Sequence, residues 1–345
     1  MKGAVFLGDR KVELREFPDP EPGPGEVIVQ TRASGMCGSD LHVYRHQPGG
    51  PATQGDRIVG HEPAGVVCQV GQGVTPDVAS VGDRVMIHHY IGCTRCDACR
   101  LGWPQMCTGA PFQAFGTQVH GGHAPLIKAP ASTLVLLDPA LSFEAGATIG
   151  CGTGTAWGAL DRLGNVGGET LVVFGQGPVG LSATLLATAR GARVIAVDPE
   201  PARRAHARRL GAAAVLDPTA NDPVEALRDL TSGGAAFVLE TSGNSAAITA
   251  GLQSLRPWGS ICLVGLGGEV GFRVEDHFRS QITLMTSWTL SIVAQRRCAE
   301  FIATRELPVD DIFTHRWDLD DVVEAYANFD LQAGGKGVIL FEQDA

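Results

Sequence analysis

Residues 170–198 read TLVVFGQGPVGLSATLLATARGARVIAVD, and this stretch decides the fold of the central part of the chain. An apolar segment runs into the glycine pattern Gly175-Gln-Gly177-Pro178-Val179-Gly180, a helical segment of small residues follows, and a second apolar segment ends at Asp198. The pattern G-x-G-x-x-G is weak evidence alone, but here it follows an expected strand and opens an expected helix. We therefore expect a strand, a helix and a parallel strand, the repeating unit of a doubly wound sheet.

The same stretch has the residues that a bound dinucleotide needs. The first glycine makes the turn, the second lets the backbone approach a pyrophosphate, and the third lets the helix pack closely on the strand. N–H groups at the start of the helix then face the phosphates. Asp198, eighteen residues after Gly180, is placed to bind ribose hydroxyls and to repel a 2′-phosphate, which favours NAD over NADP. Arg203 either helps to bind the adenosine end of the cofactor or is only a solvated charge on a helix. The alternative for the whole motif is an ordinary glycine-rich turn with a capping aspartate.

The rest of the chain divides by the period of its apolar residues. Before residue 143, short alternating segments between Pro and Gly turns predict a β-rich, partly closed barrel that includes a strand over 82–90. From residue 143 to about residue 289, helical segments alternate with strands, which favours a parallel sheet covered by helices. The tail then has two helical segments, 292–306 and 319–330, and a last strand over 337–341.

Four cysteines lie close together in the segment CTRCDACRLGWPQMC, which spans 93–107 with the spacing C-x2-C-x2-C-x7-C. Two residues between thiols let both sulfurs reach one ion, and Zn²⁺ takes four such ligands in a tetrahedron. Charged residues between the cysteines argue against buried apolar thiols, the lack of an export signal argues against disulfides, and the long last gap argues against a bacterial ferredoxin cluster. We expect a structural zinc site formed by Cys93, Cys96, Cys99 and Cys107.

A second group of candidate metal ligands consists of Cys37, His61, Glu62 and Cys151. A catalytic zinc has three protein ligands and an open position, and two thiolates with one imidazole form one such set. Cys37 and His61 belong to the β-rich part and Cys151 lies where it gives way to the αβ part, so we expect this metal at the mouth of an interdomain cleft. An isolated Cys or His is more often structural, but each of these lies in a turn of small residues with polar neighbours.

Composition excludes several classes of function. The chain has 345 residues, with 27 Lys and Arg against 37 Asp and Glu, so its net charge is −10. An acidic chain repels phosphate backbones, and we therefore expect no nucleic-acid partner. No apolar run approaches the ~18 residues that span a membrane, so we expect no membrane partner and a cytoplasmic location. Nine cysteines suit a reducing compartment in which thiols bind metals.

These motifs together resemble the zinc-dependent medium-chain alcohol dehydrogenase family, which includes polyol and threonine dehydrogenases. The resemblance covers nearly the whole chain and depends on Gly60-His61-Glu62-x-x-Gly65, the four-cysteine segment and the dinucleotide loop. It implies a GroES-like β-rich catalytic domain over 1–151 with a structural zinc lobe, a Rossmann NAD-binding domain over 152–289, and a segment over 290–345 that completes the catalytic domain. It also implies two zinc ions per subunit, NAD, an alcohol or carbonyl substrate, and a homo-oligomer, more often a tetramer than a dimer.

The resemblance also assigns roles to single residues. Cys37, His61 and Cys151 would bind the catalytic zinc, since no carboxylate lies between Glu144 and Asp161 to replace the cysteine as in sorbitol dehydrogenases. Glu62 would be a second-sphere or transient ligand. Ser39 and His42 would pass the substrate proton to water, with ribose hydroxyls between them, or Ser39 would only cap a turn and His42 lie on the surface. Asp40 is placed to orient His61. His88 and His89 either reach the substrate pocket or, as we expect, are strand residues without a catalytic role.

We expect an NAD-dependent zinc alcohol dehydrogenase that acts on a primary or secondary alcohol or a polyol. The zinc would lower the pKa of the bound alcohol so that an alkoxide passes hydride to NAD⁺. The alternative is a zinc-stabilised NAD-binding protein without turnover, acting as a sensor or structural partner. A relative of the quinone reductases ranks last because those proteins lack the cysteine lobe.

Overall fold

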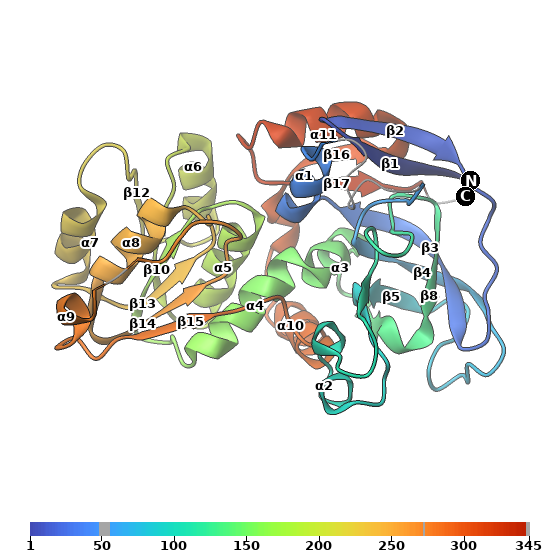
Figure 1. Cartoon of the computed structure of the whole chain (residues 1–345), viewed down its shortest axis with the longest axis horizontal. Coiled ribbons are helices and arrows are strands. Elements are labelled where there is room, and N and C mark those ends of the chain that lie inside the picture. Colours follow the sequence, from blue (N-terminus) through green and yellow to red (C-terminus); the bar gives the residue numbers. More distant parts are fainter. Residues whose placement is uncertain (48–55, 272, 343–345) are drawn as a thin grey trace. The chain divides into compact units, whose positions relative to one another are not determined.

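The computed structural model describes residues 1–47, 56–271 and 273–342, and the chain separates into two compact units (Figure 1). The first unit is discontinuous and consists of Met1–Gly154, Leu290–Gln332 and the C-terminal segment that begins at Lys336. The second unit consists of Thr155–Thr289 and the short segment Ala333–Gly335. A chain that leaves one unit and returns to it brings residues from both ends of the sequence into one core.

A mostly antiparallel, seven-stranded sheet forms the body of the first unit. Its strand order is β16-β17-β3-β4-β5-β9, and β8 also pairs with β3. The strands are β3 (Glu26–Gly35), β4 (Glu62–Val70), β5 (Arg84–Ile87), β8 (Leu126–Pro130), β9 (Leu134–Leu136), β16 (Phe313–Asp318) and β17 (Lys336–Leu340). Because β17 pairs antiparallel with β3, the last strand of the chain lies beside one of the first, as Figure 1 shows.

Shorter elements complete the first unit. A hairpin of β1 (Lys2–Gly8) and β2 (Lys11–Glu16) packs with the helices α1 (Gly38–Tyr44) and α11 (Val322–Asp330). The rings of Phe6, Tyr44 and Tyr326 meet in this buried core. The remaining elements are β6 (Tyr90–Ile91), α2 (Asp97–Arg100), η2 (Pro104–Met106), β7 (Gln113–Ala114), η3 (Ala131–Thr133), α3 (Phe143–Gly150), α10 (Ile292–Thr304), η4 (Val309–Ile312) and η5 (Leu319–Asp321).

The strand predicted over 82–90 is wrong at its end. β5 stops at Ile87 and β6 begins at Tyr90, so His88 and His89 lie between two strands, and both side chains are buried. The backbone N–H of His88 donates to Thr133 and the carbonyl of His89 accepts from Phe115, so these two residues bond to two different neighbouring segments. The change of partner breaks the regular ladder.

The second unit contains a parallel six-stranded sheet with the order β12-β11-β10-β13-β14-β15. The strands are β10 (Thr170–Phe174), β11 (Arg193–Val197), β12 (Ala214–Leu216), β13 (Ala235–Glu240), β14 (Leu255–Leu263) and β15 (Thr283–Thr286). The helices are α4 (Gly152–Leu163), which starts at the unit boundary, α5 (Pro178–Ala189), α6 (Pro201–Arg209), α7 (Pro223–Thr231), α8 (Ser245–Gln253) and α9 (Val274–His277). The central strands are buried on both faces, as expected where helices cover both sides. This confirms the predicted doubly wound parallel sheet.

The order of these strands identifies the edge at which open α/β sheets usually bind a ligand. The chain builds outward from β10 through β11 to β12, then crosses back to the other side of β10 with β13. The strand order therefore reverses between β10 and β13, and in open α/β sheets ligands bind beyond the carboxyl ends of the strands at such a point. The glycine loop that follows β10 lies at this edge.

Candidate active site

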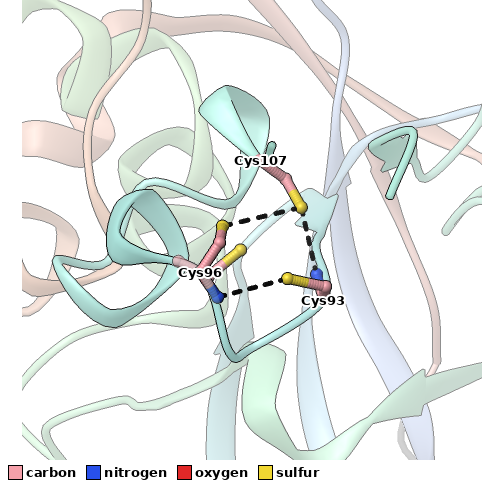
Figure 2. A group of neighbouring side chains, drawn as sticks. Cys93, Cys96 and Cys107 are labelled. Carbon is pink, nitrogen blue, oxygen red and sulfur yellow. Dashed lines mark hydrogen bonds between the residues drawn. The ribbon is translucent and has the colours of Figure 1, made fainter. Parts of the chain in front are cut away.

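The four cysteines of the predicted structural site converge in the first unit, as Figure 2 shows for three of them. The sulfur atoms of Cys93, Cys96, Cys99 and Cys107 all lie within 4.8 Å of one another, and all four cysteines are free. Cys96 Sγ is 3.9 Å from Cys107 Sγ. A tetrahedron with Zn–S bonds of ~2.3 Å has edges of about 3.8 Å, so the arrangement has the dimensions of a four-thiolate zinc site.

Backbone N–H groups stabilise negative charge on this cluster. The N–H of Cys93 donates to Cys107 Sγ and that of Cys96 donates to Cys93 Sγ, each over 3.4 Å. Backbone N–H groups also lower the pKa of Cys96 to about 5, whereas burial and the neighbouring thiols raise the pKa of Cys99 to about 12. Zinc binding needs thiolates, and neighbouring thiolates repel one another. A cation bound to all four sulfurs would neutralise this repulsion.

The second predicted ligand group also converges within the first unit. Cys37, His61, Glu62 and Cys151 each offer a ligand atom within 4.8 Å of the others. The two sulfurs are 3.9 Å apart, again close to the ~3.8 Å edge of a tetrahedral zinc site. The bond with Cys151 lowers the pKa of the Cys37 thiol well below its usual value, and the same bond together with burial raises that of Cys151 well above it. Cys37 is therefore the thiol of this pair that favours the charged form, which is the form that binds a metal.

The imidazole of His61 is oriented by a buried carboxylate. His61 Nδ1 is 2.9 Å from Asp40 Oδ1, which leaves Nε2 as the nitrogen that is free to bind a metal. Burial lowers the pKa of His61, but the Asp40 carboxylate and the Cys37 thiolate outweigh it and raise the value well above the usual range. Asp40 Oδ2 also accepts a 2.8 Å hydrogen bond from the N–H of Cys37, so one carboxylate holds both ligands.

Glu62 is paired with a lysine that the sequence analysis did not identify. Lys336 Nζ is 2.5 Å from Glu62 Oε2, and both side chains are 0% exposed. Lys336 also donates to the carbonyl of Met36 over 2.9 Å, while Glu62 Oε1 has no hydrogen-bond partner within the described parts of the chain. Burial raises the pKa of Glu62 to about 8, which the Lys336 ammonium opposes. The ion pair holds Glu62 beside the ligand group and uses only one of its two carboxylate oxygens.

The two predicted proton-transfer residues lie on α1, directly after Cys37. Ser39 Oγ is 3.5 Å from His61 Nε2, so its hydroxyl borders the ligand group. His42 lies one helical turn further on the same side and is exposed to solvent. The ring of His89 packs 5.2 Å from that of His61, and its Nδ1 is 3.0 Å from the carbonyl of Gly150. His89 therefore borders the ligand group.

The dinucleotide loop has the conformation that its glycines predict. Gly175 has φ +81°, and a Cβ on Gly180 would lie 1.8 Å from the carbonyl oxygen of Gly175, so only glycine allows α5 to approach β10. A Cβ on Gly177 would meet nothing within 4 Å, so the loop is open there. Gly177 caps α5 without a side-chain hydrogen bond, and Pro178 and Val179 form its first turn. Pro178 has no N–H group, so an anion at this helix start would be bound by the N–H groups of Val179 and Gly180.

Asp198 directly follows β11 and lies beside this loop. Its Oδ2 accepts from the N–H of Gln176 over 2.6 Å and its Oδ1 from that of Glu200 over 2.8 Å, which fixes the carboxylate. Arg203 Nη1 is 3.9 Å from Asp198, and its Nε donates to the carbonyl of Gly334. Both predicted residues therefore lie at the edge where an adenosine ribose binds in this fold.

A cavity of about 290 Å³ opens beyond the carboxyl ends of β14 and β15 in the second unit. It is lined by the glycine-rich turn 265–268, by Ile248 and Val270, and by Thr286, Ser287 and Trp288. Open α/β sheets bind ligands beyond the carboxyl ends of their strands, so this cavity is a candidate ligand site. The local sequence gave no motif for it beyond the glycines.

Two family models match the chain. An alcohol dehydrogenase GroES-like domain matches residues 23–139 and a zinc-binding dehydrogenase domain matches residues 178–304. YphC of Escherichia coli (strain K12), a zinc-type alcohol dehydrogenase-like protein, is 39% identical over 99% of this chain and 99% of its own. L-threonine 3-dehydrogenase of Pyrococcus abyssi is 32% identical over 95% and 94% of the two chains. Sorbitol dehydrogenase of Bacillus subtilis (strain 168) is 35% identical over 77% and 75%.

Solved structures agree with these relatives. The alcohol dehydrogenase TADH from Thermus sp. ATN1 has a TM-score of 0.90 and 27% identity, and the match covers 99% of this chain and 100% of that one. A zinc-binding dehydrogenase from Sinorhizobium meliloti 1021, bound to NADP, has a TM-score of 0.89 and 26% identity over 99% of each chain. Because the sequence similarity extends over the full length and the fold is shared, the chain belongs to the zinc-dependent medium-chain alcohol dehydrogenase family.

Proposed function

We propose that this protein is an NAD-dependent zinc alcohol dehydrogenase that oxidises a primary or secondary alcohol or a polyol and reduces the matching carbonyl compound. The observation that carries the proposal is the convergence of Cys37, His61, Glu62 and Cys151 within 4.8 Å in the unit that also holds the four-cysteine group. Two thiolates and one imidazole leave an open position on zinc, which is the ligand set of a catalytic site. Four thiolates form a closed site that supports the fold.

When bound, the zinc supplies a Lewis acid that favours the deprotonated alcohol, and the dinucleotide supplies the hydride acceptor. The chain's own residues do the rest. Asp40 holds His61 in the tautomer that presents Nε2, and Lys336 holds Glu62 beside the ligands. Ser39 takes the proton of the substrate hydroxyl, because its own hydroxyl both accepts and donates and borders the ligand group.

The proton then needs a route to water. We assign this step to His42, which lies one turn after Ser39 on α1 and is exposed. An imidazole can accept a proton on one ring nitrogen and release one from the other, so an exposed histidine is suited to hand the proton to solvent. The family resemblance implies that hydroxyl groups of a bound cofactor would take part in this route between Ser39 and His42.

We assign the cofactor site to the loop of Gly175, Gly177 and Gly180 and to Asp198 and Arg203. Asp198 supports NAD as the preferred cofactor, since its fixed carboxylate would accept hydrogen bonds from the ribose and repel a 2′-phosphate. Arg203 is the weaker assignment because its Nε already donates to Gly334.

We also propose a homo-oligomer, a dimer or a tetramer. β15 is the outermost strand of the parallel sheet and has no partner on its outer side in the described parts of the chain. Leu284 and Trp288 at this edge are partly exposed, with Trp288 46% exposed. An unpaired edge with apolar side chains favours pairing with a second copy.

No helix among the described residues combines the length and apolar character that a membrane span requires.

A screen of nicotinamide reduction with primary alcohols, secondary alcohols and polyols tests this function. We expect turnover with at least one class, faster with NAD than with NADP, and loss of turnover in Cys151→Ser with the fold intact by circular dichroism. A protein that binds NAD and zinc but turns over none of the substrates would instead support a sensor or structural role. Full activity of Cys151→Ser would refute the ligand assignment.

A further inference from the structure

A chain of buried hydrogen bonds leads from His61 into the interior of the first unit. Asp40, which bonds to His61 through Oδ1, accepts a 3.1 Å hydrogen bond from the hydroxyl of Tyr326 through Oδ2. The Tyr326 oxygen is 2.8 Å from His123 Nε2, and His123 Nδ1 is 2.8 Å from Ser34 Oγ. Asp40, Tyr326, His123 and Ser34 are all buried.

The direction of every hydrogen in this chain follows from its acceptor end. A carboxylate only accepts, so the Tyr326 hydroxyl donates to Asp40 and its oxygen accepts from His123 Nε2. The other ring nitrogen, Nδ1, then carries no hydrogen and accepts from the Ser34 hydroxyl. Burial keeps His123 neutral by lowering its pKa to about 4, and burial and Asp40 keep Tyr326 protonated by raising its pKa. Three donors in series thus point toward Asp40.

The two rings are held in place by packing. Tyr326 meets the Phe6 ring edge-on, with centroids 4.7 Å apart and an interplanar angle of 89°. His123 lies against Gly60, the residue before the ligand His61, and a Cβ on Gly60 would lie 2.3 Å from His123 Nδ1. Gly60 also has φ +87°, so glycine is needed there both for the backbone and for the His123 ring.

We propose that Tyr326 is a positioning residue for the His61 ligand, acting through Asp40, and that His123 and Ser34 fix the direction in which Tyr326 donates. This inference rests on the proposed catalytic zinc site and extends it to a helix far from the reacting atoms in the sequence, because Tyr326 lies 286 residues after Asp40. Tyr326 stabilises the charge on Asp40 Oδ2, which leaves Oδ1 aligned with His61 Nδ1.

The expected loss of zinc affinity becomes smaller with each further hydrogen bond between the substituted residue and His61. Loss of a direct partner of a ligating histidine costs 10–100-fold in metal affinity, so Asp40→Asn sets the upper limit. Tyr326 acts through one more hydrogen bond, and we expect Tyr326→Phe to weaken zinc binding at this site by roughly 3- to 10-fold. Ser34→Ala, two bonds further, should have a smaller effect in the same direction.

Zinc release to a chelating dye measures this effect without turnover. The release step that belongs to the catalytic site is the one absent in Cys151→Ser. The matched control is Tyr44→Phe, which removes a hydroxyl from the same buried cluster, since the Tyr44 ring lies 5.6 Å from that of Tyr326. We expect Tyr326→Phe to weaken the assigned step and Tyr44→Phe to leave it unchanged. Cobalt substitution gives a second readout, because a tilted imidazole shifts the visible absorption of the catalytic cobalt.

A double-mutant cycle tests whether Tyr326 acts through Asp40. In the Asp40→Asn background, Tyr326→Phe should cause no further loss of zinc affinity. Equal zinc release and cobalt spectra in Tyr326→Phe and Tyr44→Phe, or a full additional loss in the Asp40→Asn background, would overturn the inference and leave the proposed function standing. A wild-type protein without a release step that depends on Cys151 would overturn the proposed function, and the inference with it.

Discussion

Replacing Lys336 with methionine should strongly destabilise the first unit. The Lys336–Glu62 pair is fully buried, with 2.5 Å between Nζ and Oε2, and Lys336 also bonds to the Met36 carbonyl. Methionine keeps most of the volume but leaves the Glu62 carboxyl without its cation. Above pH 8, where Glu62 with its pKa of about 8 is ionised, breaking this buried ion pair from one side costs about 3–5 kcal/mol, because the remaining charge keeps its desolvation penalty. At roughly 2–4 °C per kcal/mol, the melting temperature should fall by roughly 6–20 °C.

Thermal and urea unfolding of the zinc-loaded protein above pH 8 measure this loss. Lys128→Met is the matched control, because Lys128 is 46% exposed and lies 3.6 Å from Glu26. A surface pair contributes about 0–1 kcal/mol, so this control should unfold almost as wild type does. Adding Glu62→Gln to Lys336→Met should recover much of the stability, since the unpaired buried charge is then gone. The reasoning is refuted if Lys336→Met is as stable as Lys128→Met, or if the second substitution recovers nothing.

Two further predictions concern the cofactor and pH. Asp198→Gly should raise the KM for NAD roughly 10-fold and increase the ratio of NADP to NAD use. The control is Asp217→Gly, which removes a carboxylate paired with Arg204 directly after β12 and should change neither quantity. Steady-state kinetics with both cofactors measure these effects. The free energy of unfolding should decrease as the pH is lowered from about 6.5 to about 4. Burial lowers the pKa of His88 and of His123 to about 4, so over this range the unfolded chain binds protons that the folded chain does not. Each of these two histidines contributes about 3 kcal/mol to this loss of stability. His88→Asn should therefore reduce the loss, whereas the control His46→Asn, at an exposed position, should not. An unchanged dependence of the unfolding free energy on pH in His88→Asn would contradict the assignment to buried histidines.

Local patterns were enough to predict much of the fold. The glycine loop between β10 and α5 and the spacing of the four cysteines both act over fewer than about twenty residues, where chain geometry leaves few choices. Alternation of helices and strands predicted the parallel sheet for the same reason. The strand over 82–90 was wrong at His88 and His89 because their partners, Thr133 and Phe115, lie on two different segments that the local pattern does not reveal.

The supporting residues of the site could not be predicted locally. Lys336 reaches Met36 across 300 residues of sequence, and Tyr326 reaches Asp40 across 286. These contacts exist because β17 pairs with β3 and α11 packs beside β17, which places the end of the chain against its beginning. The available signals were a lysine at the start of an apolar strand and a tyrosine on the apolar face of a helix. A buried lysine is unusual and a buried tyrosine usually bonds through its hydroxyl, but neither signal identifies the partner.

A metal count on Cys151→Ser tests the central claim most directly, namely that this cysteine completes a second, catalytic zinc site with Cys37 and His61. The wild-type protein should hold about two zinc ions per chain. Cys151→Ser should hold about one fewer, retain the zinc of the cysteine lobe and lose turnover, whereas substitution of the buried Cys298 by serine should change neither count nor turnover. An unchanged zinc content in Cys151→Ser, with turnover retained, would contradict the account.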